Sequence, residues 1–170
     1  MPAIPDSRWQ YIVGHISEDG VVQVMSFEHL QSLFDGWSRL IPQGLEMDGP
    51  LAILPTSRSL FAHSRFDCEF MVVATLVSFQ ALESAFHTLY PNVDESYPFK
   101  KLVKRARRDG TLDSRFADLA DTAEELRNLL SHPRGAAVFT VGMAASMIEQ
   151  IHRLVVLILE TARLKSINVD

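Results

Sequence analysis

Arg127, Asn128 and His132 lie close together in the chain, just before Pro133. A guanidinium keeps its charge and makes two-pronged hydrogen bonds to phosphate. An imidazole titrates near neutral pH, so it can take up or release a proton during a reaction. Together these residue types predict a site that binds a phosphate group and moves a proton beside it.

The spacing of these residues limits how they can meet. In a helix, Asn128 and His132 are one turn apart on the same face, whereas Arg127 is about 140° around an ideal helix from His132. Either the helix loosens before Pro133, or Arg127 binds a phosphate held mainly by a second copy of the chain. A purely structural role is also open, because a histidine in the last turn of a helix is stabilised by the helix dipole.

A second feature is a run of cations in residues 100–108, where six of nine residues are lysine or arginine. On a helix, one face would carry Lys101, Lys104, Arg105 and Arg108. Such a face can follow the phosphates of a nucleic acid. The alternative is a solvated helix surface whose cations lie near the favourable C-terminal end.

Common signatures of metal and cofactor enzymes are not found in the sequence. There is no phosphate-binding loop, no dinucleotide-binding glycine motif, no nucleophile elbow and no zinc-protease motif. The six histidines are never two to five residues apart, and one cysteine cannot build a typical zinc site. We therefore expect neither a metal nor a cofactor.

The composition is that of a globular protein. Of 170 residues, 47% are hydrophobic and 22% are charged, and the formal net charge is −5. Contact with nucleic acid must therefore come from a local basic patch. The first thirty residues lack the pattern of a secretion signal and the apolar runs are short, so we expect a cytoplasmic protein without a membrane partner.

Residues 1–56 are predicted to form a small appendage of a hairpin and a helix. β-prone runs on either side of Asp19-Gly20 predict a β-hairpin over residues 11–25. Apolar residues at helical spacing between Leu30 and Leu40 predict a short amphipathic helix. Prolines and glycines in residues 42–55 then indicate a connection.

Residues 57–170 are predicted to form an all-α, antiparallel four-helix bundle. The expected helices cover residues 59–89, 98–108, 113–131 and 140–164. The first and last of them carry more apolar residues than one core needs. We expect the N-terminal appendage or a second copy of the chain, in a homodimer, to cover the surplus.

The segment from Arg127 to His132 resembles the motif of the HEPN superfamily (higher eukaryotes and prokaryotes nucleotide-binding domain). That motif is an arginine followed four to six residues later by a histidine, often with a polar residue beside the arginine. Here Asn128 follows the arginine, and the motif ends a predicted bundle helix. The resemblance covers roughly residues 60–165, and it implies the HEPN-like bundle as the fold.

The resemblance implies a metal-independent endoribonuclease, often a toxin or a defence effector, whose site forms across a homodimer. Cleavage of RNA by its own 2′-hydroxyl leaves cyclic-phosphate ends and needs a base, an acid and a cation. Two copies of His132 would supply the base and the acid, Arg127 would hold the phosphate, and Asn128 would orient these groups.

The resemblance also assigns partners to the other features. RNA becomes the expected ligand of the cationic segment, through Lys100, Lys101, Lys104, Arg105 and Arg108. Glu83 is either a surface residue or a carboxylate that orients Arg127. An antitoxin or regulatory protein is a candidate partner. The competing hypothesis is a non-catalytic helical module for dimerisation or interaction, or a regulatory subunit.

Overall fold

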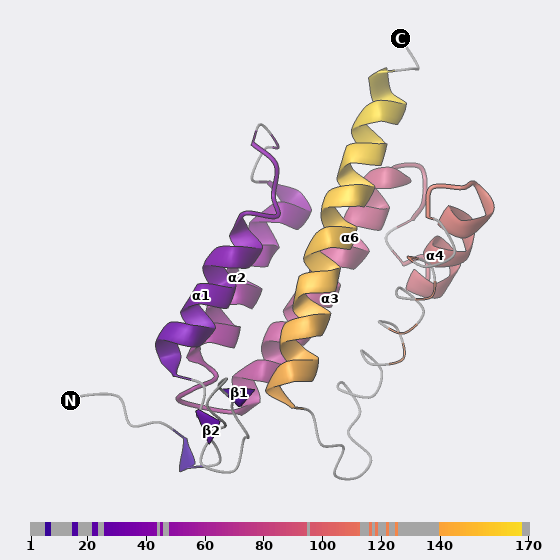
Figure 1. The fold of residues 1–170 in the computed structure, drawn as a ribbon. Coiled ribbons are helices and arrows are strands. Elements are labelled where there is room, and N and C mark those ends of the chain that lie inside the picture. Colours follow the sequence, from indigo (N-terminus) through magenta and orange to yellow (C-terminus); the bar gives the residue numbers. More distant parts are fainter. Residues whose placement is uncertain are drawn as a thin grey trace.

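The computed structural model describes residues 6–7, 15–16, 22–23, 26–43, 45, 48–94, 96–112, 116, 118, 122, 125 and 140–167. Its helices are α1 (Phe27–Ser38), α2 (Gly49–His63), α3 (Glu69–Leu89), α4 (Phe99–Arg108) and α6 (Val141–Ile167) (Figure 1). The chain is therefore all-α in class, as predicted.

Two short strands near the N-terminus pair with each other. β1 (His15–Ile16) and β2 (Val22–Gln23) are antiparallel, with Ile16 opposite Val22. The predicted turn at Asp19-Gly20 lies outside the described residues, so the hairpin as a whole stays a prediction.

α1 confirms the short amphipathic helix that the sequence predicts between Leu30 and Leu40. Ser26 caps its first turn, because the Ser26 hydroxyl accepts a hydrogen bond from the backbone N–H of His29 (3.2 Å). Leu30 and Trp37 are buried on its inner face, which packs against the other helices.

The connection predicted over residues 42–55 is wrong from Gly49 onward, because α2 begins there. Pro50 lies in the first turn, where a missing N–H costs nothing, since that group would have no partner within the helix. Pro55 removes one backbone hydrogen bond, but the buried stripe of Leu51, Leu54 and Phe61 holds the helix together. Residue 56, the predicted domain boundary, lies inside α2, and the division into an appendage and a bundle stays a prediction.

The single long helix predicted over residues 59–89 is also wrong, because the chain turns between α2 and α3. The Ser64 hydroxyl donates to the carbonyl oxygen of Phe61 (2.6 Å) at the end of α2. The Asp67 carboxylate then accepts a hydrogen bond from the backbone N–H of Glu69 (3.0 Å), the first residue of α3. Local side-chain hydrogen bonds therefore break a run whose apolar pattern continues across the turn.

The helices predicted over residues 98–108 and 140–164 are confirmed as α4 and α6. The helix predicted over residues 113–131 is described only at Phe116, Asp118, Thr122 and Glu125, which are helical. The remainder of that helix, and with it the HEPN-like arrangement of four helices, stays a prediction.

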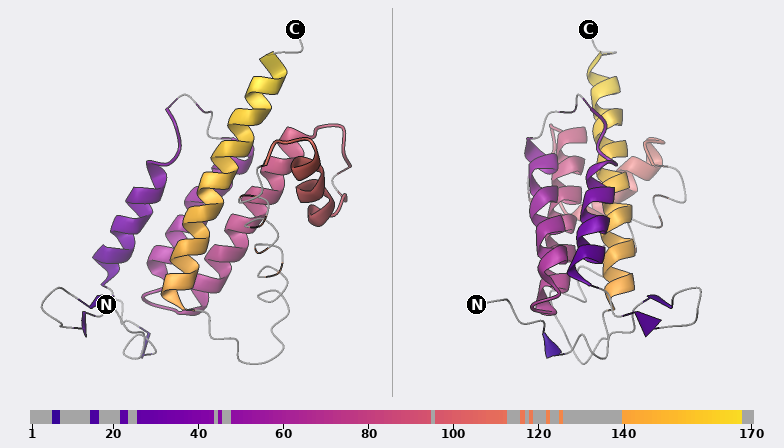
Figure 2. Two further views of the ribbon diagram at one scale, coloured as in Figure 1. Left: turned by 45° about the vertical axis from the view of Figure 1, so that its right-hand side comes forward. Right: turned by 60° about the vertical axis from the view of Figure 1, so that its left-hand side comes forward.

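α1, α2, α3 and α6 lie side by side in all three ribbon views (Figures 1 and 2). The most extensive packing is that of α3 against α2 and against α6. One apolar cluster joins α1 to the start of α3 and α6 around Trp37 and Phe61. A larger cluster joins α2, α3 and α6 to α4, where the rings of Phe86 and Phe99 meet edge to face at 5.5 Å. The aromatic contact fixes α4 across the end of α3.

α3 and α6 are long and apolar enough to cross a membrane by length and composition alone. Within the windows that pass this test, 50% and 56% of the residues are buried inside the protein. Core helices of soluble proteins pass the same test, so the cytoplasmic location stays a prediction.

Candidate functional site

The predicted catalytic residues Arg127, Asn128 and His132 lie outside the described residues. Glu83 is half-buried on α3, and its predicted pairing with Arg127 is therefore untested. Asp118, which precedes these residues in the chain, contacts α4, because Arg107 donates a hydrogen bond to its carboxylate (2.7 Å). Asp118 of the predicted third helix therefore lies beside α4.

α4 has one apolar and one cationic face. Its inner face buries Phe99, Leu102, Val103 and Ala106. The cations predicted to share a face do so, since one pocket of about 310 Å³ is lined by Tyr97, Lys101, Lys104, Arg105 and Arg108. Lys100 is exposed on the same helix and does not line this pocket.

Among the described residues, no carboxylate forms an ion pair with the cations that line this pocket, Lys101, Lys104, Arg105 and Arg108. α4 itself contains no acidic residue. Because like charges held close together repel one another, such a pocket favours an anion as its ligand.

Two tyrosines fix the cations of the pocket. The Lys101 ammonium lies 5.6 Å from the ring centroid of Tyr97, and the Arg105 guanidinium lies 4.5 Å from that of Tyr90. Tyr97 also packs against the larger apolar cluster, so its ring is held from behind. Sequence analysis missed both tyrosines because neither belongs to the helix that carries the cations.

Tyr90 is the centre of a polar network that ties α4 to α6. Its hydroxyl donates to the Asp109 carboxylate (2.7 Å), which also accepts from Thr111. Lys165 of α6 donates to the Thr111 hydroxyl (2.9 Å) and lies 3.7 Å from Asp109. Burial acts to raise the pKa of Asp109, but the hydrogen bonds from Thr111 and Tyr90 outweigh it and lower that pKa.

Tyr90→Phe is expected to lower the free energy of unfolding by about 1 kcal/mol, because the Asp109 carboxylate loses one hydrogen bond while the ring stays in place. Chemical denaturation measures this change. Tyr97→Phe is the matched control, since the Tyr97 hydroxyl makes no hydrogen bond to the described residues. Equal losses in both variants would contradict the network.

Sequence analysis also missed a buried polar pair between α2 and α6. Arg58 is only 4% exposed and His152 is fully buried. Arg58 Nη1 donates to His152 Nε2 (3.3 Å), and His152 Nδ1 donates to the carbonyl oxygen of Ile148 (2.8 Å). Both residues occupy positions of an apolar helical stripe, and a polar residue at such a position is the sequence feature that could have revealed them.

Aromatic rings of α1 cover this buried pair. The Arg58 guanidinium lies 5.2 Å from the ring centroid of Phe34, and the ring of Trp37 lies 6.0 Å from that of His152. Burial lowers the pKa of both Arg58 and His152, and that of His152 falls to about 4. His152 is therefore neutral near pH 7 and serves as an acceptor for the buried cation.

A second pocket, of about 720 Å³, lies between α6 and the described residues of the predicted third helix. Its lining residues are Phe116, Asp118, Thr122, Ser146, Glu149, Gln150 and Arg153. Arg153 is paired with Glu149 (2.8 Å), so this pocket carries mixed charge and does not favour an anion as the α4 pocket does.

Among the described residues there is no group of histidine, cysteine and carboxylate side chains that could hold a metal ion. The cationic pocket of α4 is thus the candidate site that the described geometry supports best, and its chemistry is that of an anion-binding surface. Comparison with known proteins finds no matching family model, no matching curated protein and no matching solved structure.

Proposed function

We propose that this protein binds RNA through the cationic face of α4 and cleaves it without a metal, as a HEPN-type endoribonuclease in the cytoplasm. The observation that carries the proposal is the pocket whose four cations lack carboxylate partners among the described residues. A protein with a net charge of −5 repels polyanions over most of its surface, so this patch would direct RNA to one place.

The proposed reaction uses the ribose of the RNA as nucleophile. One His132 takes the proton of the 2′-hydroxyl, and the 2′-oxygen bonds to phosphorus. The bond from phosphorus to the 5′-oxygen breaks, and a second His132, from the partner copy in a homodimer, protonates that oxygen. The products are a 2′,3′-cyclic phosphate and a 5′-hydroxyl.

The other proposed site residues act on the phosphate or on its ligands. Arg127 stabilises charge on the phosphoryl oxygens, Asn128 orients the imidazole, and Glu83 orients Arg127. The ion pair between Arg107 and Asp118 supports this arrangement, because it brings Asp118, which precedes Arg127 in the chain, to the proposed RNA-binding helix. The proposed role of the protein is that of a toxin or a defence effector, and its proposed protein partner is an antitoxin or a regulatory protein.

A non-catalytic interaction module is the second candidate. Large apolar side chains are exposed on α3 and α6, namely Val73, Met143, Leu164 and Ile167. The two residues at the end of α6, Leu164 and Ile167, are 58% and 62% exposed. A helical partner or a second copy of the chain could cover them.

The proposed function is tested by incubating the purified protein with a single-stranded RNA in excess EDTA. Cleavage that yields cyclic-phosphate ends is the expected result, because none of the proposed groups needs a metal. RNA binding without cleavage would favour the interaction module, with RNA as one of its ligands. If the protein neither binds nor cleaves the RNA, the proposal is overturned.

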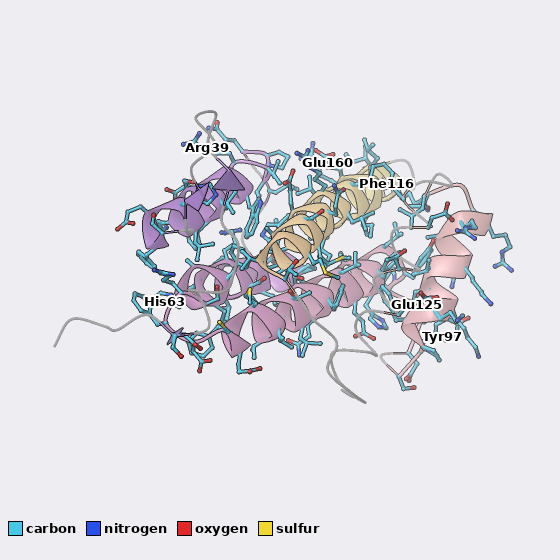
Figure 3. All side chains as sticks on the ribbon, turned by 60° about the horizontal axis from the view of Figure 1, so that its bottom comes forward. Arg39, His63, Tyr97, Phe116, Glu125 and Glu160 are labelled. Atoms are coloured by element: carbon cyan, nitrogen blue, oxygen red, sulfur yellow. The ribbon has the colours of Figure 1, made fainter. Side chains whose placement is uncertain are left out.

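The salt dependence of RNA binding measures the contribution of each cation. Lys104→Gln should reduce the slope of log K against log salt concentration by about 0.7, the value for one phosphate contact on a single strand. Arg39→Gln is the matched control, since Arg39 is an exposed residue directly after α1, and Figure 3 labels it at the side of the molecule opposite Tyr97. An unchanged slope in Lys104→Gln would show that Lys104 does not contact an RNA phosphate.

A further inference from the structure

The cations of α4 line one open pocket. Lys101, Lys104, Arg105 and Arg108 come from two consecutive turns of the helix, and all four line the same space of about 310 Å³. A volume of this size is at the lower end of the range for small-molecule sites, and is comparable to a nucleotide.

The charge in this pocket exceeds what one backbone phosphate can neutralise. A phosphodiester carries one negative charge, whereas a phosphomonoester carries about 1.5 to 2 near pH 7 and offers three strong acceptor oxygens. Two guanidinium groups and two ammonium groups surround the pocket, and in the described part of the chain no carboxylate pairs with them. Guanidinium groups bind phosphate oxygens in pairs, which suits a terminal phosphate better than a bridging one.

The remaining wall of the pocket is the aromatic ring of Tyr97. Tyr97 is half-buried against the larger apolar cluster, and its hydroxyl makes no hydrogen bond to the described residues. A ring held in this way can contact a ribose or base, and its hydroxyl can donate to a ligand oxygen. The pocket therefore joins a site for a dianion to a site for the nucleoside that carries it.

From these observations we propose that the α4 pocket binds one nucleotide with a terminal phosphomonoester. The phosphate contacts Lys104, Arg105 and Arg108, and the nucleoside lies against Tyr97. Such a nucleotide is either free or the 5′-terminal residue of an RNA. The second source rests on the proposed RNA binding, and the first does not.

The test measures two preferences of the full chain in buffer without divalent ions. Calorimetry compares adenosine 5′-monophosphate with adenosine, and fluorescence anisotropy compares one RNA oligonucleotide bearing a 5′-phosphate with the same RNA bearing a 5′-hydroxyl. In both comparisons the phosphorylated ligand should bind at least about tenfold more tightly, since one charge-assisted contact contributes that much. Arg108→Gln should reduce the preference severalfold, and Arg39→Gln should leave it unchanged.

The outcomes separate this inference from the proposed function. If both RNAs bind equally and the monophosphate does not bind, the pocket inference is overturned while RNA binding stands. If the monophosphate binds and neither RNA does, the pocket inference holds for a free nucleotide and the proposed function fails. If the monophosphate binds while both RNAs bind equally, the source is again the free nucleotide. If no ligand binds, both are overturned.

Discussion

His132→Ala is expected to reduce the rate of RNA cleavage by more than about 10²–10⁴-fold, which is the usual contribution of one general acid or base. The loss exceeds that of a single proton transfer because the substitution removes the base and the acid of the proposed mechanism together. Single-turnover cleavage of a labelled RNA, with protein in excess, measures the rate. The affinity for RNA should change little, because the cations of α4 remain.

His29→Ala is the matched control, since His29 is exposed on α1 and has no assigned role. Light scattering of both variants shows whether the proposed homodimer persists. Undiminished cleavage by His132→Ala would assign the activity to another group or to a contaminant. Circular dichroism of the variant shows whether a loss of cleavage is caused by a loss of folding.

The protein is expected to lose about 3 kcal/mol of stability as the pH falls from 6.5 to about 4, because burial lowers the pKa of His152 to about 4 from an ordinary value of 6.5. The Arg58 cation acts in the same direction, and the hydrogen bond to Ile148 opposes both. Between these two pH values the unfolded chain binds a proton at this position and the folded chain does not. The stabilisation is therefore complete above pH 6.5 and disappears as the pH approaches 4.

Urea denaturation at several pH values measures this dependence, and His152→Gln isolates it. Glutamine offers an oxygen to the Arg58 guanidinium but does not titrate, so the variant should show a flatter dependence of stability on pH. Carboxylates contribute equally to both proteins and cancel in the difference. Parallel curves for the two proteins would contradict a neutral, buried His152.

Helical periodicity predicted α1, α4 and α6 because each has a clear apolar face. It failed at α2, where Gly49, Pro50 and Pro55 are typical of a connection. The position of a proline decides its effect, and Pro50 is harmless in the first turn. The break after His63 escaped notice because the apolar pattern continues across the turn, and the hydrogen bonds that form the turn are not visible in that pattern.

In the candidate site too, relations within one helix could be predicted from the sequence, whereas contacts between helices could not. Spacing within one helix predicted that Lys101, Lys104, Arg105 and Arg108 share a face, because that relation depends on the helix alone. The placement of Tyr90 against Arg105, and of Arg58 against His152, depends on packing between helices. No periodicity within a single segment contains that information.

In the proposed reaction, the RNA's own 2′-oxygen attacks phosphorus while protein side chains move the protons. Incubation in EDTA of two RNAs of identical sequence, one unmodified and one with 2′-O-methyl groups throughout, tests it most directly. Binding of both and cleavage of the unmodified RNA alone is the predicted result. Cleavage of the methylated RNA at a comparable rate, or no cleavage of either by protein that binds them, would contradict it.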